Sequence, residues 1–436
     1  MTDAPAPTAD VPPGRLKEIV AWAMYDWANS AYSTLLITVI LHYLQEVVLP
    51  GRAGVAAYAG GIGAAMLLVA LASPVLGAVA DANRSKRRCL AVTALGGAAA
   101  AVAMGLLPPQ WPAAVVAAFV LMSVMFDLAL VPYNGFLPEI TTPQTINRVS
   151  AFGFSMGYLG GSIPLAATLG LVKFGPQFGL DAELQHRAAL LLLGAWWGGF
   201  TLPALLVLRD RGPRRRQSLP AAAREALTEV GRTLASVRRF PALAWFLLAF
   251  LFYNDGMQTV ITQANTLASK DFQFTLEELC VFVLVIQLVA LPSSLAVGWL
   301  ADRVGVKPTL LGCLTVWLGL LLGVAVVSSA IQFWVLGIVL ATVLGGTQAV
   351  SRAAVGLMTP ARRAAEFFGF FNVSGKAAAF LGPVLFASVY GWTQSTRAAA
   401  ASIIPFFLVG GAIVAAINFA AGRRQALEPN PETDSS

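Results

Sequence analysis

Charged residues are scarce in this chain. Asp, Glu, Lys and Arg make up 12% of its 436 residues, whereas 57% of the residues are hydrophobic. This composition excludes an ordinary soluble domain, in which about 25% of the residues are charged. The net charge of +7 could suggest a nucleic-acid partner, but the basic residues gather between long apolar runs, so no nucleic acid is expected. The partner that the composition predicts is a lipid bilayer.

Cysteine is also rare. Its three residues, Cys89, Cys280 and Cys313, lie in or beside apolar runs. An odd number of cysteines without metal-type spacing predicts neither a disulfide framework nor a zinc site. The stretch Gly369–Lys376 lacks the glycine spacing and the Ser or Thr of a phosphate loop, and no nucleophile lies beside a base. We therefore expect no enzyme activity, no cofactor, no metal and no ATP-driven pumping.

Long apolar runs are abundant instead. Twelve segments are long enough to cross a hydrocarbon core of ~30 Å at ~20 residues each. Their approximate limits are 19–48, 54–80, 89–108, 112–138, 146–174, 186–208, 241–268, 275–300, 308–328, 331–358, 364–390 and 398–421. The sequence thus predicts an all-α polytopic membrane protein with twelve transmembrane helices.

Lysine and arginine are distributed unequally over the connections between these segments. One side carries the cluster Arg84–Arg88, the arginine-rich stretch 209–239 and the basic residues near both chain ends. The other side holds only Arg52, Lys173, Arg187, Lys270 and Arg397. The positive-inside rule therefore predicts a protein of the cytoplasmic membrane with both termini in the cytoplasm. Residues 1–17, which lack the apolar core of a signal peptide, and 422–436 are expected to be disordered tails.

The two halves of the chain repeat each other. Gly77-x-x-x-Asp81 corresponds to Gly298-x-x-x-Asp302, and Thr142-Pro143 to Thr359-Pro360, each about half a chain apart. Such spacing is typical of two parallel six-helix repeats. We expect six-helix bundles at 18–208 and 241–421, joined by a cytoplasmic linker, 209–240, that contains an amphipathic helix.

A polar face interrupts the first apolar segment. In the stretch YDWANSAYSTLL, helical spacing places Tyr25, Asp26, Asn29 and Tyr32 on one half of the circumference. A carboxylate inside a membrane span is costly unless it faces a polar cavity or a partner, so Asp26 is a candidate functional residue. The alternative is a structural Asp that neighbouring hydroxyls satisfy.

Other intramembrane polar residues lie in the fourth, seventh and eleventh segments. They are Asp127 and Asn134, then Asp255, Gln258 and Thr262, then Asn372 and Lys376. The seventh segment carries its polar residues along one stripe, as a helix beside a cavity does. Two alternatives remain open: Asp255 and Lys376 form a structural pair between helices, and hydroxyl groups cap Asp127.

Several longer motifs resemble a known family. GAVADANRSKRR and GWLADRVGVKP resemble the loop signature of the major facilitator superfamily, although Ala82 and Arg84 replace a basic residue and a glycine in the first copy. YDWANSAYSTLL, VPYNGFLPEITTPQTINRVSAFGFSMGYLGG, FYNDGMQTVI, LGGTQAVSR and EFFGFFNVSGKAAAFLGP are similar to the vacuolar amino-acid effluxers, the autophagy-related branch of that superfamily. The resemblance implies a central cavity between helices 1, 4, 7 and 10.

The loop signature also implies gating residues on the cytoplasmic side. Asp81 and Asp302 are expected to bind groups of helices 4–5 and 10–11, with Arg362 and Arg363 as the candidates for Asp81. The remaining gating candidates are Arg84, Arg303 and Arg352, of which Arg352 can instead extend toward the cytoplasm.

The function that follows is secondary transport by alternating access, most simply by a monomer and in exchange for protons. A zwitterionic amino acid fits one cation and several carboxylates: Lys376 for its carboxylate, Asp26 or Asp255 for its ammonium. The other aspartates, Asp127 included, are candidates for carrying the proton, because burial favours the neutral form of a carboxylate. The alternatives are proton-coupled export of a drug or of an uncharged or cationic metabolite, and a non-transporting sensor or lipid scramblase.

Overall fold

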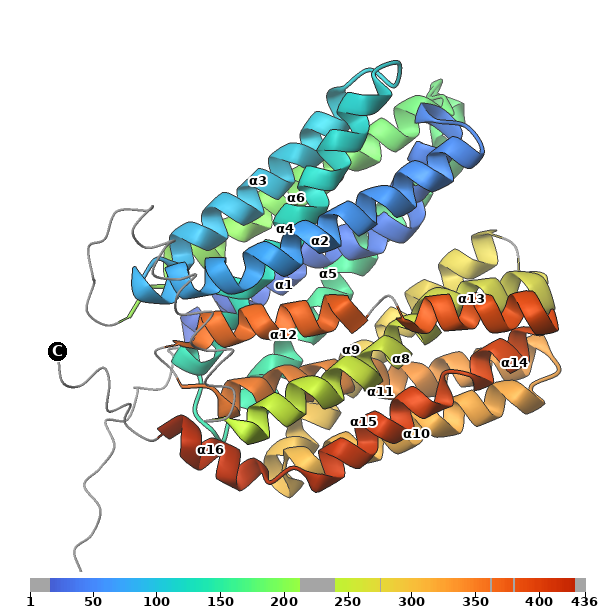
Figure 1. The fold of residues 1–436 in the computed structure, drawn as a ribbon. Coiled ribbons are helices and arrows are strands. Elements are labelled where there is room, and N and C mark those ends of the chain that lie inside the picture. The colour runs from blue at the N-terminus through green and yellow to red at the C-terminus, as the bar shows by residue number, and fades with distance from the viewer. Residues whose placement is uncertain (1–15, 212–239, 275, 361–362, 379–380, 428–436) are drawn as a thin grey trace, which may run out of the picture.

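The computed structural model describes residues 16–211, 240–274, 276–360, 363–378 and 381–427, and the regular elements in these ranges are helices (Figure 1). Residues 1–15 and 428–436 of the two predicted tails, the predicted linker helix and Arg362 lie outside the described residues. The remaining tail residues, 16–17 and 422–427, were expected to be disordered but belong to helices. Both described chain ends, Leu16 and Leu427, lie on one side of the molecule, which we call the terminal side; the opposite side is the distal side.

The first half of the chain forms one bundle. Its elements are α1 (Leu16–Leu35) with its π-helical continuations η1 (Leu36–Ile40) and η2 (Tyr43–Val48), α2 (Arg52–Ala82), α3 (Lys86–Leu106), α4 (Pro112–Ile140), α5 (Ile146–Phe174), η3 (Gly175–Phe178) and α6 (Ala182–Val207). Local chemistry explains several helix starts. Pro112 stands at the beginning of α4, where its missing N–H costs nothing, and the carboxylate of Asp181 accepts a hydrogen bond from the N–H of Leu184 at the start of α6.

The second half forms the other bundle. Its elements are α8 (Pro241–Asp271), α9 (Leu276–Val304), α10 (Val306–Val326), α11 (Ala330–Met358), α12 (Ala364–Ala378), α13 (Leu381–Thr393), α14 (Thr396–Ala401), α15 (Ile404–Ala416) and α16 (Phe419–Leu427). The eleventh and twelfth segments, each expected as one helix, are therefore divided. In the twelfth, α15 begins directly before Pro405, which cannot donate the backbone hydrogen bond that would continue α14.

Ten helical spans in the described residues are long and apolar enough to cross a membrane. They correspond to ten of the twelve predicted segments. The other two predicted segments are α8 and the pair α12–α13, which do not meet this criterion over the described residues. The all-α polytopic architecture predicted from hydropathy is thus what the structure has.

Each bundle has its own apolar core. Trp22, Phe119 and Trp197 are fully buried among residues of α1, α3, α4 and α6. Trp317 and Phe407 are buried in the same way between α10 and α15, with their rings stacked at 5.6 Å. Each half therefore packs around its own core, and the molecule consists of two helical bundles in contact.

The halves meet at the terminal side and diverge toward the distal side (Figure 1). The main contacts between the halves are made by α2 and α4, which lie against α12, and by α5, which lies against α9 and α11. Glycines allow the approach. A Cβ at Gly77 of α2 would overlap the carbonyl oxygen of Ala365, and a Cβ at Gly298 of α9 would overlap the Cβ of Ala151 on α5. The repeated glycines are therefore the points at which helices of opposite halves touch.

The repeated aspartates lie one turn beyond these glycines and bind the facing helix starts. Asp81 accepts a hydrogen bond of 2.9 Å from the N–H of Glu366 at the start of α12. Asp302 accepts one of 3.0 Å from Asn147 Nδ2 and pairs with Arg148 Nε at 2.8 Å, both at the start of α5. A carboxylate at a helix N-terminus is favoured by the unpaired N–H groups there. Each half thus inserts one aspartate into the other.

The expectation that Arg363 pairs with Asp81 is wrong. Arg363 binds the carboxylate of Glu366, one turn away, through Nε at 2.7 Å and Nη2 at 2.8 Å. Asp81 has a nearer cation, Lys86 at the start of α3, whose Nζ lies 2.9 Å from Asp81 Oδ1 and 2.6 Å from Glu139 Oε1. Lys86 is 3% exposed. Because Lys86 and Asp81 both belong to the first half, the cation next to Asp81 comes from its own half.

Two of the other predicted gate arginines, Arg84 and Arg303, contact their own half. Arg84 donates to the backbone carbonyl of Arg211. Its φ is +50°, and Gly305, three residues after Asp302, has a φ of +98°. Both copies of the loop signature therefore need a left-handed backbone at this position, which glycine adopts without strain and arginine does not. Arg303 lies over the ring of Trp299 at 3.8 Å and is exposed.

Lengthening the side chain at Gly77 should open the terminal side. In Gly77→Leu the added atoms would enter the space of the α12 backbone, and overpacking of this kind costs about 1–3 kcal/mol. We expect about ten-fold faster maleimide labelling of a cysteine introduced at the buried Ser73 in a cysteine-free background. Gly60→Leu, on the same helix with open space around it, is the matched control. Equal labelling in both variants would contradict this role of Gly77.

The strain at Arg84 can be isolated by comparing two substitutions. Arg84→Gly and Arg84→Ala both lose the contact with Arg211, but only glycine relaxes the left-handed backbone. We expect the glycine variant to be more stable than the alanine variant by about 1 kcal/mol, measured by thermal unfolding of the purified protein. Equal melting temperatures would show that the positive φ carries no strain.

Candidate functional site

A buried ion pair joins the two halves on the terminal side of the molecule. Arg352 of α11 places Nη1 3.0 Å from Oδ2 of Asp26 on α1, and both side chains are almost completely buried. The same nitrogen lies 3.5 Å from Oδ1 of Asn134 on α4. A charge from the second half is therefore neutralised within the first half.

The rest of the guanidinium is also surrounded by the first half. Nε donates to the hydroxyl of Ser150 at 2.9 Å, and Nη2 donates to the backbone carbonyl of the same residue at 2.7 Å. The rings of Phe154 and Trp22 lie 4.2 and 4.8 Å from its central carbon. Arginine suits this position because its planar fork can bind several acceptors and stack on aromatic rings at once.

Gly153 makes room for the pair. A Cβ at this position would lie 2.5 Å from Asp26 Oδ2 and 2.8 Å from both Arg352 Nη2 and the ring of Trp22. The pairing was not predicted, although the sequence contains the signal: two opposite charges inside membrane segments need partners. Sequence spacing could not show that this aspartate and this arginine, 326 residues apart, face each other.

The other polar residues predicted on α1 and α4 lie within the first half. Tyr25 is fully buried, with its ring 4.9 Å from that of Tyr133. The hydroxyl of Tyr32 donates to Ser123 Oγ at 2.8 Å. Asn29 and Asp127 are buried. These side chains contribute to the polar interior of the bundle.

Some of the polar residues predicted in the second half bind backbone groups of their own half, and one reaches the first half. Asp255 of α8 is fully buried, and its Oδ2 accepts the N–H of Gly382 at 2.8 Å, at the start of α13. Thr262 donates to the backbone carbonyl of Gln258. Asn372 of α12 reaches the first half, donating to the backbone carbonyl of Asp127 at 2.9 Å and to Ser73 Oγ at 3.2 Å. The side chain of Lys376 lies outside the described residues, so its pairing with Asp255 stays a prediction.

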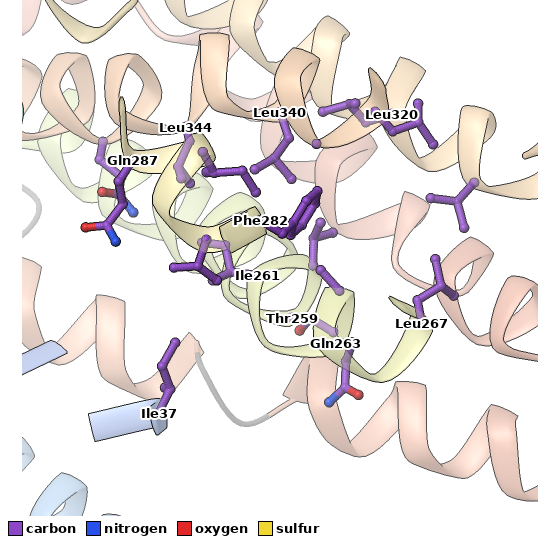
Figure 2. Close-up of a pocket in the computed structure, with 18 of the residues that line it drawn as sticks. Ile37, Thr259, Ile261, Gln263, Leu267, Phe282, Gln287, Leu320, Leu340 and Leu344 are labelled. Carbon is purple, nitrogen blue, oxygen red and sulfur yellow. The ribbon is translucent and has the colours of Figure 1, made fainter. Parts of the chain in front are cut away.

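Figure 2 shows a cavity of about 320 Å³. Its lining residues on α1 and α11, such as Ser33 and Leu344, lie further toward the distal side than Asp26 and Arg352 on the same helices. The first half contributes residues of α1, η1 and α5, such as Thr34, Ile37 and Phe154. The second half contributes most of the wall, from α8, α9, α10 and α11, and the labelled Phe282, Leu320, Leu340 and Leu344 show its apolar character. The cavity is thus shared by both halves.

The predicted substrate-binding residues are not among the described residues that line this cavity. Their neighbours are: Ser30 and Ser33 on α1, and Thr259 on α8. The resemblance implied a cavity between helices 1, 4, 7 and 10, but the described lining includes no residue of α4. Sequence reasoning missed most of this lining because it is made of Leu, Ile, Val and Phe, which cannot be told from core residues. The sequence contained only a weak indication of this lining: two polar residues, Gln287 and Gln348, each interrupt an apolar run.

The sequence comparisons agree on one family. Residues 52–427 match the model of the family described as "Vacuole effluxer Atg22 like". The chain is 30% identical over 406 residues to the uncharacterized MFS-type transporter YxiO of Bacillus subtilis, covering 92% of this chain and 94% of that protein. It is 25% identical over 303 residues to autophagy-related protein 22 of Cryptococcus neoformans, covering 65% of this chain and 52% of the fungal protein. The chain thus spans about half the length of this fungal relative.

Solved structures show the same fold at low sequence identity. The human organic anion transporter MFSD10 superimposes with a TM-score of 0.69 at 16% identity, over 91% of this chain and 98% of that one. The transporter FucP, in the outward conformation, gives a TM-score of 0.70 at 12% identity, over 92% and 98%. With its repeated halves, the cavity that they share and these matches, the chain belongs to the vacuole effluxer Atg22-like family of the major facilitator superfamily.

Proposed function

We propose that this protein is a secondary transporter that carries a small solute across the cytoplasmic membrane by alternating access. One observation carries the proposal: the buried Asp26–Arg352 pair links the two halves on one side of a cavity that both halves line. Such a link has to break before the cavity can open toward the terminal side. A single buried pair next to the cavity can therefore control which side of the membrane the solute reaches.

The unequal distribution of basic residues supports a cytoplasmic terminal side. With the terminal side in the cytoplasm, the contact between the halves there and their divergence distally support an outward-facing state. The likeness to FucP in the outward conformation supports the same assignment. In this state the solute exchanges with the outside, and the cytoplasmic route is closed by Asp26–Arg352, Asp81–Glu366 and Asp302–Arg148.

Proton exchange gives this cycle a direction. A proton on Asp26 removes the anion from the pair and leaves Arg352 with neutral acceptors and aromatic rings, which bind a cation less strongly. Protonation from the outside would therefore release α11 from α1 and open the cytoplasmic side. Proton entry then accompanies solute export. Asp127 and Asp255 are the further candidates for carrying a proton.

The family and the shared cavity bear on the chemistry of the solute. The family description suggests an effluxer, and the fungal branch makes amino acids the first candidates. The expected zwitterion site relied on Asp26, Asp255 and Lys376, but the first two carboxylates have protein partners of their own. The mostly apolar cavity therefore favours a solute with an apolar body, such as an apolar amino acid, a neutral derivative of one, or an apolar drug.

Asp26→Asn should separate transport from coupling. The substitution imitates the protonated carboxyl group and keeps its shape, so exchange of solute down its gradient should persist. Accumulation against a gradient, driven by an imposed pH difference across liposomes, should fall at least ten-fold. Asp181→Asn, at the distal start of α6, is the control and should accumulate solute like the original protein.

If Asp26→Asn still accumulates solute as well as the control does, Asp26 does not couple transport to protons. If the original protein shows no saturable flux for amino acids, peptides, drugs or nucleosides, transport itself is contradicted. A sensor or a scramblase with this fold then remains, and lipid movement in the same liposomes distinguishes these two.

A double-mutant cycle should measure the ion pair. Arg352→Met leaves a buried carboxylate unpaired, which typically costs about 3–5 kcal/mol. The double variant Asp26→Asn, Arg352→Met has neither charge and should recover much of this loss in thermal unfolding. Arg303→Met, at the exposed arginine over Trp299, should cost less than about 1 kcal/mol. Additive effects in the double variant would mean that the two charges do not interact.

A further inference from the structure

The cavity lining includes three polar side chains that have no hydrogen-bond partner in the part of the chain that the structure describes. They are Ser30 of α1, Tyr158 of α5 and Gln348 of α11. All three side chains are partly exposed, and their hydroxyl and amide groups are accessible, in contrast to the enclosed amide nitrogen of Gln287. A solute in the cavity can therefore reach these groups.

These side chains lie one helical turn from the ion pair. Ser30 follows Asp26 by four residues on α1, and Gln348 precedes Arg352 by four residues on α11. Residues at this spacing share a helix face and are separated by a rise of about 5.4 Å per turn. Phe154, whose ring lies 4.2 Å from the central carbon of Arg352, is itself part of the lining. The three polar residues thus separate the ion pair from the rest of the cavity, and we call them the polar floor.

Two glycines bring the polar floor together. A Cβ at Gly157 of α5 would lie 2.6 Å from Ser30 Oγ, so this hydroxyl points at α5 beside Tyr158. A Cβ at Gly345 of α11 would lie 2.5 Å from the ring of Tyr158 and 3.0 Å from its hydroxyl. The phenol of the first half therefore packs against the second half, on the α11 turn that also carries Gln348. Both halves contribute to the polar floor.

The polar floor and the opposite wall differ in chemistry. Each group of the floor can donate a hydrogen bond, because hydroxyls and carboxamides carry N–H or O–H groups. If an apolar surface covered these donors, they would lose water without gaining a partner, which costs free energy. The opposite wall, with Phe282, Leu320 and Leu340, is apolar (Figure 2). A solute with an acceptor oxygen at one end and an apolar body at the other therefore fits in one orientation.

We propose that the polar floor holds the oxygen-bearing end of the solute through hydrogen bonds donated by Ser30, Tyr158 and Gln348. This inference rests on the proposed transport function and deepens it, because it names the head group and the residues that bind it. The class of solute is a carboxylate or a carbonyl joined to a compact aliphatic or aromatic body. Since the floor belongs to both halves, a solute bound there contacts the same helices, α1 and α11, that the ion pair connects.

Three compounds with the same branched aliphatic body test the class. Leucine carries a carboxylate, leucinamide carries a carbonyl, and 3-methylbutylamine carries neither. We expect leucine or leucinamide to bind the purified full-length protein at least ten-fold more tightly than the amine in calorimetry. The tighter of the two then shows whether the acceptor is a carboxylate or a carbonyl, and either order supports the proposal. Equal or tighter binding of the amine would overturn it, and so would the absence of binding by all three compounds.

Substitutions then locate the head group. Tyr158→Phe removes the hydroxyl and keeps the ring, and Gln348→Leu removes the amide and keeps the size. Each should weaken binding of the tighter oxygen-bearing compound about ten-fold, or about 1.4 kcal/mol, with the melting temperature and the affinity for the amine unchanged. Unchanged affinity in either variant would contradict the site. An equal loss for the amine would contradict the hydrogen bonds, because it would show that the substitution alters the shape of the cavity.

Two control variants change the same chemical groups elsewhere. Tyr43→Phe removes a phenol hydroxyl of η2 that is outside the described lining and, like that of Tyr158, has no partner among the described residues. Gln177→Leu replaces an exposed glutamine of η3. Both should bind leucine and leucinamide like the original protein. A ten-fold loss in either control would mean that the effect of the floor variants is not specific to the cavity, which would overturn the assignment.

Binding and transport can fail separately. If leucine or leucinamide binds, and the floor variants weaken it, but liposomes carry no solute, the proposed function is wrong and the head-group site holds. If liposomes carry leucine with the same KM in Tyr158→Phe, Gln348→Leu and the original protein, transport holds and this inference is wrong.

Discussion

A charge buried away from water needs a partner, and this protein meets that need across the boundary between its halves. Arg352 has its acceptors on α1, α4 and α5 of the other half. Asp302 finds its partners on α5, and Asp81 finds the start of α12. If the halves separated, Arg352 and Asp302 would lose these partners and Asp81 would lose its bond to α12, so the terminal side is closed by electrostatics and hydrogen bonds as well as by apolar contact. The same contacts can be released when a charge changes.

The internal repeat makes two such closures, and their chemistry differs. Gly77 and Gly298 let helices of opposite halves approach in the same way. Beside Asp302 the cation is Arg148, whose side chain is half exposed. Beside Asp81 it is Lys86, buried between two carboxylates of its own half. A surface pair contributes little and is screened by salt, whereas a buried cluster is costly to rearrange. The two closures of a symmetric fold therefore need not open with equal ease.

The cavity extends mainly into the second half, whereas the ion pair lies in the first. The apolar wall is formed by α8, α9, α10 and α11, and Arg352 from α11 reaches into the other bundle. One helix, α11, thus contributes to both features: Leu340 and Leu344 line the cavity, and Arg352 lies two turns further along. A solute that packs against this helix and a proton that reaches Asp26 would act on the same element, which is a physical route for coupling them.

The sequence by itself determined the membrane class, the helical segments, the repeat and the residues that carry intramembrane charge. These features are local, because hydropathy, helix length and glycine–aspartate spacing are read within a few turns. The tertiary structure alone decided which charges meet. Asp26 meets an arginine from the other half, Arg363 binds Glu366 in preference to Asp81, and Asp255 binds the start of α13. It also decided where the cavity lies, because a leucine that lines a cavity and a leucine in a core have the same hydropathy and differ only in which neighbours the fold brings to them.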